Sequence, residues 1–251
     1  MTEAAAWALA LFVLGAITGS FLANLAIRWP REQSVMRGRS ACDACGKTLG
    51  AGELIPLVSA AIQRGKCRGC SAAIDPRHWQ IELGCALIGA AAGFVVAGPV
   101  AVAGAIFGWL LLTLAAIDVA EFWLPDALTA TLAVAGLVSG IAGIAPDLTD
   151  RVIGGAGGFA ALWLVAFAYR RLREREGLGG GDPKLFGAIG LWLGWRMLPI
   201  VLLLASAVGL ALVLAEMLSG RKMARDTRLP FGALLAVAAY PAWLVMIGSM
   251  P

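Results

Sequence analysis

The sequence predicts an all-α polytopic membrane protein of about eight transmembrane helices, with one small, zinc-stapled loop domain on the cytoplasmic side. Three observations lead to this fold class. Hydrophobic residues make up 60% of the 251 residues. Charged residues make up only 14%, well below the roughly 25% of an average soluble domain. Apolar runs long enough to cross a bilayer recur along the chain, and the basic residues gather between them.

The positions of the basic residues set the predicted orientation. Of the 20 Lys and Arg residues, nine lie in 28–77, five in 170–184 and four in 221–228. Basic loops remain in the cytoplasm, so the segments 28–80, 170–184 and 219–229 are expected on that side. Each basic cluster borders an apolar run, so we expect contact with membrane lipid rather than with nucleic acid.

The apolar runs predict eight crossings, which leave both termini outside. The stretch 185–218 must hold two of them, because basic segments bound it on both sides. Arg196 and Pro199 interrupt this stretch, so its first crossing is expected to be short or to begin inside the membrane. The other crossings are expected within 1–27, 81–97, 100–117, 127–145, 152–169 and 230–249. The predicted domains are a first helix (1–27), a polar loop domain (28–80) and a transmembrane core (81–251).

The polar loop domain is too small for a large core and contains a cysteine pattern that would staple it. Two C-x-x-C pairs stand twenty-one residues apart: Cys42, Cys45, Cys67 and Cys70. This spacing predicts a structural tetrahedral zinc site with no open coordination position, and redox dithiols are the main alternative. The fifth cysteine, Cys85, is interpreted as a small packing residue. We interpret nearby His78 as a polar residue at the membrane surface.

Two carboxylates stand at the ends of apolar runs. Asp118 closes the run 110–117, and Asp182 follows the glycines of 177–181. A carboxylate facing lipid costs several kcal/mol, so each is expected to meet water, a partner or a substrate. Our central hypothesis is that the two face each other at one membrane surface and share a water. The alternatives are that Asp182 caps a helix with Pro183 behind it, and that Asp118 is a solvated acid past a helix end.

Together with the cysteine loop, the segments around these acids resemble the type IV prepilin leader peptidases, a family of GxGD-type membrane aspartic proteases. The likeness covers nearly the whole chain in six ordered landmarks. Beside the cysteine loop they are Gly19-Ser-Phe-Leu22, Ile81-Glu-Leu83, Ile117-Asp118-x6-Pro125-Asp126, Gly179-Gly-Gly-Asp182-x-Lys184-Leu185 and Leu229-Pro-Phe-Gly232.

The resemblance implies that Asp118 and Asp182 are a catalytic pair. It implies cleavage of the basic leader of prepilins and pseudopilins, before their hydrophobic N-terminal helix, at the cytoplasmic face of the bacterial inner membrane. Many members then methylate the new N-terminus with S-adenosylmethionine. Two residues depart from the family pattern: Asn24 stands one position later than the usual Asn, about 100° around a helix, and Pro183 replaces a Val or Ile.

The chemistry of the residues fits this reading. Two carboxylates that share a site cannot both ionise at low cost, so they share a proton. The ionised acid takes a proton from water while the protonated one polarises the scissile carbonyl. Glycines Gly179, Gly180 and Gly181 would let a substrate backbone approach closely. A basic leader would find Glu121 and Asp126 nearby, although Asp126 also suits a helix cap.

Two other classes of protein remain as alternatives. The chain would be a membrane N-methyltransferase without peptidase activity, or a non-enzymatic transporter or assembly factor stapled by zinc. A transporter is expected to place ionisable residues near the bilayer midplane, often in a repeated fold. Here the acids cluster at predicted cytoplasmic ends, and no repeat is apparent. The sequence also lacks G-x-G-x-x-G, so we expect no Rossmann-type methyltransferase domain.

Overall fold

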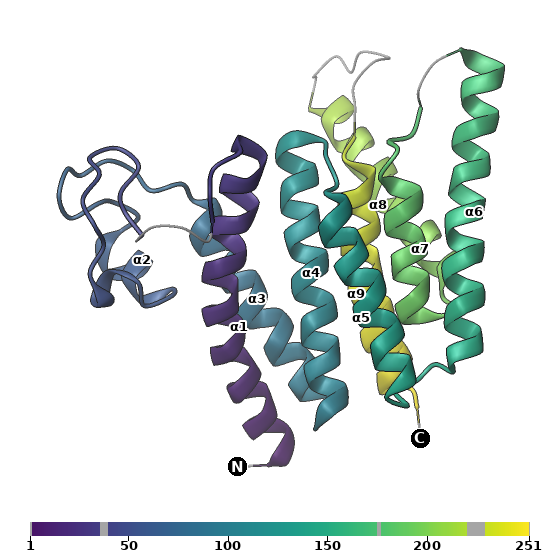
Figure 1. Ribbon diagram of the computed structural model, residues 1–251, viewed down its shortest axis with the longest axis horizontal. Helices are drawn as coiled ribbons and strands as arrows, with labels where there is room; N and C mark the ends of the chain where they lie inside the picture. The colour runs from purple at the N-terminus through teal and green to yellow at the C-terminus, as the bar shows by residue number, and fades with distance from the viewer. Residues whose placement is uncertain (1, 36–39, 175–176, 220–228, 251) are drawn as a thin grey trace. The chain divides into compact units, whose positions relative to one another are not determined.

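The computed structural model describes residues 2–35, 40–174, 177–219 and 229–250, and Figure 1 shows their arrangement in helices. Within these residues the structure has helices and two isolated β-bridges but no strand. The helices are α1 (Glu3–Arg28), α2 (Val58–Gln63), α3 (Arg77–Val95), α4 (Pro99–Glu121), α5 (Asp126–Ile141), α6 (Leu148–Arg173), α7 (Asp182–Leu193), α8 (Leu198–Leu218) and α9 (Phe231–Gly248), with two short 3-10 helices, η1 (Trp29–Arg31) and η2 (Ala51–Glu53). The chain forms two compact units, Met1–Thr113 and Leu114–Pro251.

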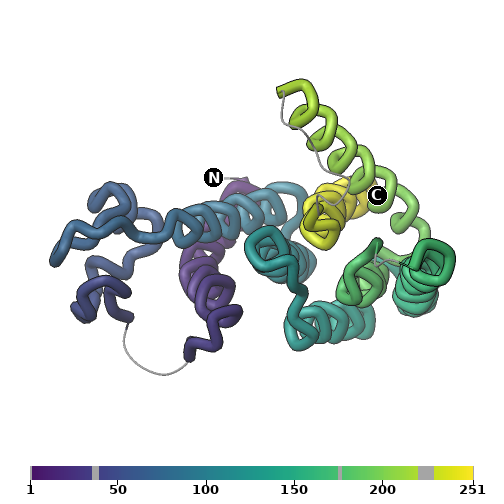
Figure 2. Tube along the Cα trace, turned by 90° about the horizontal axis from the view of Figure 1, so that it is seen from above, coloured from purple at the N-terminus to yellow at the C-terminus, as the bar shows by residue number. Residues whose placement is uncertain are grey.

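In the first unit, α1 and α3 pack side by side (Figure 2), and glycines form their closest contacts. A β-carbon on Gly19 would lie 2.8 Å from the Cα of Glu82, and one on Gly93 would lie 2.6 Å from the backbone nitrogen of Ala8. Small residues let helix backbones approach closely where both helices are apolar. This contact fixes the start of α3 beside the end of α1, and the polar segment between them builds on that pair.

In the second unit, α7 lies among α5, α6, α8 and α9. Ten of its twelve residues are buried, which explains how so short a helix is held in place. Glycines again allow the approach to α6: a β-carbon on Gly154 would lie 2.7 Å from the carbonyl oxygen of Gly190. The expectation of a short first crossing in 185–218 corresponds to α7, which ends before Arg196.

In the part of the chain that the structure describes, five helices are long and apolar enough to cross a membrane: α1 with the turn after it, α4, α6, α8 and α9. Helix α5 is apolar but shorter. The length and hydropathy of these helices confirm the prediction of a helical, multi-pass membrane protein. The number of eight crossings stays a prediction, because α3, α5 and α7 do not meet the same measure of length and hydropathy. The basic segment 221–228 lies entirely outside the described residues.

A buried arginine holds together the end of the second unit where α5 ends and α6 begins. Arg151 on α6 is fully buried, and its guanidinium donates to five backbone carbonyls. The acceptors are Gly136, Ile144, Ala145, Pro146 and Leu191, at 2.8 to 3.0 Å. The rigid fork of five N–H donors suits this arrangement, which a lysine with three donors cannot reproduce. One side chain therefore ties α5, α6 and the end of α7 together.

Candidate active site and metal centre

The two predicted acids both lie in the second unit. Asp118 is in the last turn of α4, and Asp182 is the first residue of α7. Each side chain is buried, with 5% of its surface exposed. Oδ2 of Asp118 accepts the backbone N–H of Ala233 at 2.8 Å, and Oδ2 of Asp182 accepts that of Gly179 at 2.9 Å. Each carboxylate is therefore held in one orientation by a backbone donor.

Gly232, at the start of α9, brings the two carboxylates together. A β-carbon built on this glycine would lie 3.0 Å from Oδ2 of Asp118 and 3.2 Å from Oδ1 of Asp182. The two oxygens are therefore no farther apart than the sum of these distances. The expectation that the acids face each other agrees with this geometry. The space between them exists because residue 232 has no side chain.

The geometry does not fit the alternative in which Asp182 caps its own helix. Gly181 occupies the N-cap position of α7, and no side chain caps this end. A capping carboxylate would accept an N–H from the turn that follows it. The Asp182 carboxylate instead accepts Gly179 N–H, on the preceding loop. Asp118 is likewise a buried residue inside α4, rather than a solvated acid past its end.

The three glycines before Asp182 have different surroundings. A β-carbon on Gly179 would lie 3.1 Å from Oδ2 of Asp182, and one on Gly181 would lie 2.8 Å from Cβ of Leu124. A β-carbon on Gly180 would meet nothing within 4 Å. Packing inside the protein therefore accounts for Gly179 and Gly181, whereas Gly180 faces open space.

The two other acids lie at the surface of the second unit. Glu121 is exposed at the end of α4, and Asp126 is exposed in the first turn of α5. Oδ1 of Asp126 is 2.7 Å from Nζ of Lys184. This pair links α5 to α7, so the predicted meeting of Asp126 with a substrate would have to compete with Lys184.

The four predicted cysteine ligands converge in the first unit. Their sulfur atoms all lie within 4.8 Å of one another, and Cys42 Sγ is 3.8 Å from Cys70 Sγ. Tetrahedral zinc with bonds of about 2.3 Å places its sulfur ligands roughly 3.8 Å apart. Because four thiols meet at this spacing, the residues fit a closed, structural zinc site.

Each C-x-x-C pair sits on a tight turn closed by a β-bridge. The bridges join Ala41 to Thr48 and Lys66 to Ala73. The first turn uses Gly46 at a φ of 69°, whereas Ser71, with a φ of 58°, takes the left-handed position after the second pair. Gly69 instead donates its N–H to Cys67 Sγ at 3.3 Å. This contact and others hold the pKa of the Cys67 thiol at about 6, which favours the thiolate that binds metal.

The cysteine pair gives a direct test of the metal. We expect Cys42→Ser with Cys45→Ser to lose bound zinc and to leave the loop open to proteolysis, because two ligands cannot hold the fold that four define. Elemental analysis and limited proteolysis of gently purified protein measure this. Cys85→Ala, which removes a buried cysteine of α3, is the matched control and should keep both zinc and protection. Wild-type protein purified without zinc would contradict the assignment.

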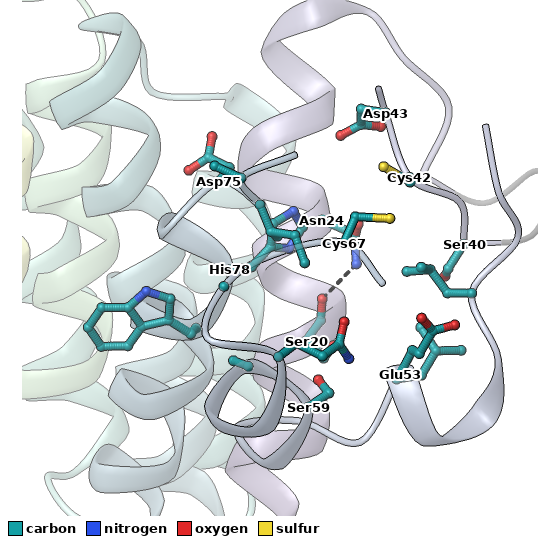
Figure 3. Close-up of a pocket in the computed structure, with 18 of the residues that line it drawn as sticks. Ser20, Asn24, Ser40, Cys42, Asp43, Glu53, Ser59, Cys67, Asp75 and His78 are labelled. Carbon is teal, nitrogen blue, oxygen red and sulfur yellow. Dashed lines mark hydrogen bonds between the residues drawn. The ribbon is translucent and has the colours of Figure 1, made fainter. Parts of the chain in front are cut away.

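A cavity of about 360 Å³ lies beside the cysteine cluster, within the first unit. Figure 3 shows side chains from α1, the loop and the start of α3 gathered around it, including Ser20, Asn24 and His78. Nδ2 of Asn24 donates to the carbonyl oxygen of Ser20 at 2.9 Å. Ala23, the position where the family pattern has Asn, is buried. The shift by one residue therefore leaves Asn24 on the cavity wall.

Comparisons with known proteins show which family the chain belongs to. The family model described as "Bacterial Peptidase A24 N-terminal domain" matches residues 13–96, and that described as "Type IV leader peptidase family" matches residues 105–214. A protein of Aeromonas hydrophila named prepilin leader peptidase/N-methyltransferase is 40% identical, over 84% of this chain and 73% of its own length.

Proteins of the same name from Pseudomonas putida and Pseudomonas aeruginosa are each 34% identical. The alignments cover 92% and 95% of this chain, and 88% and 90% of those relatives. No solved structure matches the chain.

Proposed function

Because the chain belongs to the type IV leader peptidase family, we propose that it is a membrane aspartic endopeptidase that removes the basic leader of type IV prepilins and pseudopilins. The observation that supports this most strongly is the placement of Asp118 and Asp182 on either side of Gly232. Two buried carboxylates at this separation suit a shared proton and a bound water. Neither a helix-capping role nor a surface-charge role explains the positions of both carboxylates.

The backbone donors suggest how the two acids divide the work. Asp118 accepts an N–H from the first turn of α9, where the helix dipole favours negative charge. We therefore assign Asp118 as the base that takes a proton from water. Asp182, at the opposite side of Gly232, carries the proton and polarises the scissile carbonyl. When the peptide bond breaks, the proton that Asp118 took from water passes to the amine that leaves.

The surroundings of the pair suggest how a leader is held. Gly180 faces open space, so an extended substrate backbone can approach there. Glu121 offers an exposed negative charge for a Lys or Arg of the leader. Asp126 can bind such a residue only after its ion pair with Lys184 breaks. We place this site at the cytoplasmic membrane face, with both termini outside, because the segments 28–80, 170–184 and 219–229 hold most of the basic residues.

A second proposed activity is methylation of the N-terminus that cleavage exposes. S-adenosylmethionine supplies an electrophilic methyl group when bound. The cavity beside the cysteine cluster fits such a ligand in size, since small-molecule sites span roughly 300–1,000 Å³. Its walls combine polar groups such as Ser20, Asn24 and Arg28 with apolar side chains such as Leu54. The cysteine site would order this wall and perform no chemistry.

One assay tests both activities. A peptide with a basic leader followed by a hydrophobic segment is incubated with the purified chain, with and without methyl-labelled S-adenosylmethionine. We expect cleavage before the hydrophobic segment in both cases, and label on the new N-terminus when the donor is present. Label without cleavage would favour a methyltransferase alone. If neither cleavage nor label is observed, the result favours a transporter or assembly factor.

A further inference from the structure

One buried carboxylate in the wall of the first unit's cavity forms no ion pair with a Lys or Arg of the described residues. Four acids line its wall: Asp43, Glu53, Asp75 and Glu82. The first three pair with Arg28, Lys47 and Arg77, respectively, at 2.7 to 3.5 Å. Among the described residues, no Lys or Arg side chain forms an ion pair with Glu82. A buried anion without a counter-charge is costly, so Glu82 suits a cationic ligand.

The fold holds Glu82 firmly. Only 7% of the residue is exposed, and its Oε2 accepts the backbone N–H of Leu57 at 2.8 Å. Leu57 has a φ of 62° and a ψ of −46°, a positive-φ conformation that residues with a side chain rarely adopt. The bond from Leu57 therefore fixes one carboxylate oxygen, while Glu82 remains part of the cavity wall.

The chain's only histidine lies on the same wall. His78 stands four residues before Glu82 on α3, so the two side chains share one face of the helix. His78 precedes the expected crossing 81–97. Burial lowers the pKa of His78 below its ordinary value. Three nearby carboxylates raise the pKa of His78 and so oppose this effect: Asp75, Glu82 and Asp43. The positive charge of Arg28 lowers that pKa further. The imidazole is thus neutral near neutral pH and can accept a proton.

We propose that Glu82 binds the ammonium group of the cleaved substrate's N-terminus and that His78 accepts a proton from that nitrogen when it is methylated. This inference rests on the proposed methyl transfer and assigns its amine site. His78 first takes a proton from the ammonium group, which frees an electron pair on the nitrogen. This pair forms the bond to the methyl carbon, and the carbon–sulfur bond breaks with its electron pair left on sulfur.

The two residues together favour an amine over the other cation in this reaction, the sulfonium of the methyl donor. Either cation would be attracted by Glu82. Only the amine must lose a proton, because an α-amino group with a pKa of about 7.7–8.0 is mostly protonated at neutral pH. A neutral imidazole near the carboxylate can accept a proton from an ammonium group, whereas the sulfonium has no proton to lose in this reaction.

Glu82→Gln tests the anion without removing the acceptor for Leu57 N–H. Calorimetry without donor compares a cleaved peptide that has a free N-terminus with the same peptide N-acetylated. We expect the variant to bind the free-amine peptide at least roughly tenfold more weakly and to bind the acetylated peptide as wild type does. Equal affinity of wild type and variant for the free amine would overturn the proposal. Weaker binding of S-adenosylmethionine, with unchanged binding of its neutral demethylated product, would instead place Glu82 at the sulfonium and equally overturn it.

His78→Gln tests the proton acceptor. At about pH 7 we expect methyl transfer to a pre-cleaved peptide to fall roughly tenfold or more, and at about pH 9, where the free amine loses its proton unaided, to recover most of the wild-type rate. Gln80→Ala, at an exposed position on the same turn, is the control and should match wild type. A loss that is equal at both pH values would show a structural role and overturn the assignment. Wild type that transfers no methyl group would instead remove the proposed activity itself.

Discussion

Asp182→Asn is expected to reduce the rate of leader cleavage by at least about 10³-fold, and Asp118→Asn by a similar factor. Asparagine keeps the size of each side chain and can still accept the N–H of Gly179 or of Ala233. Asparagine cannot exchange a proton. Each variant therefore lacks one of the two required functions, which are the activation of water and the polarisation of the carbonyl. Cleavage of a prepilin-like peptide by purified protein measures the loss.

The control for this prediction makes the same change elsewhere. Asp147→Asn alters an exposed carboxylate before α6 and should cleave at the wild-type rate. Both dyad variants should keep their zinc and should still methylate a pre-cleaved peptide. If Asp182 only began a helix, asparagine would serve equally well, since the two residues cap helices about equally. Wild-type cleavage by Asp182→Asn would thus support that simpler role.

The second large effect is expected at Gly232. Gly232→Val would place side-chain atoms where both carboxylate oxygens converge and within 2.7 Å of Leu124 Cδ1. The acids would have to move apart, and a displacement of about 1 Å at a reacting group can cost roughly 10²-fold in rate. We expect a loss of that size or more, and a smaller loss for Gly232→Ala.

Gly157→Val is the matched control for Gly232. Gly157 also lies inside a helix of the second unit, but a β-carbon there would meet nothing within 4 Å. The control should keep its cleavage rate and its thermal stability. A Gly232→Ala protein as active as wild type would show that the space between the acids is not needed.

The helices could be predicted from the sequence because long apolar runs have few alternatives in a membrane. Their ends could not. The run expected at 152–169 forms the helix α6 from Leu148 to Arg173, because a helix can continue past the lipid with charged residues on it. The short α7 was expected from the break at Arg196, and its burial on nearly all sides required knowledge of the neighbouring helices.

The candidate sites were predictable to different degrees. Cysteine spacing indicates a metal site directly, because it reflects local geometry. Gly232 and Glu82 appear in the sequence only as family landmarks, and their roles depend on residues more than twenty positions away, such as Asp118 and Leu57. The interpretation of His78 as a surface residue was incomplete, because it lines the cavity, and sequence alone does not show which helix face meets a cavity.

The most direct test of the central claim compares Asp118→Asn, Asp182→Asn and the double variant in one cleavage assay. Residues that act as one unit show losses that do not add. We therefore expect the double variant to cleave no more slowly than either single variant, in protein that keeps its zinc and its helical content. Losses that multiply in the double variant, or a single variant that cleaves at the wild-type rate, would contradict a shared catalytic pair.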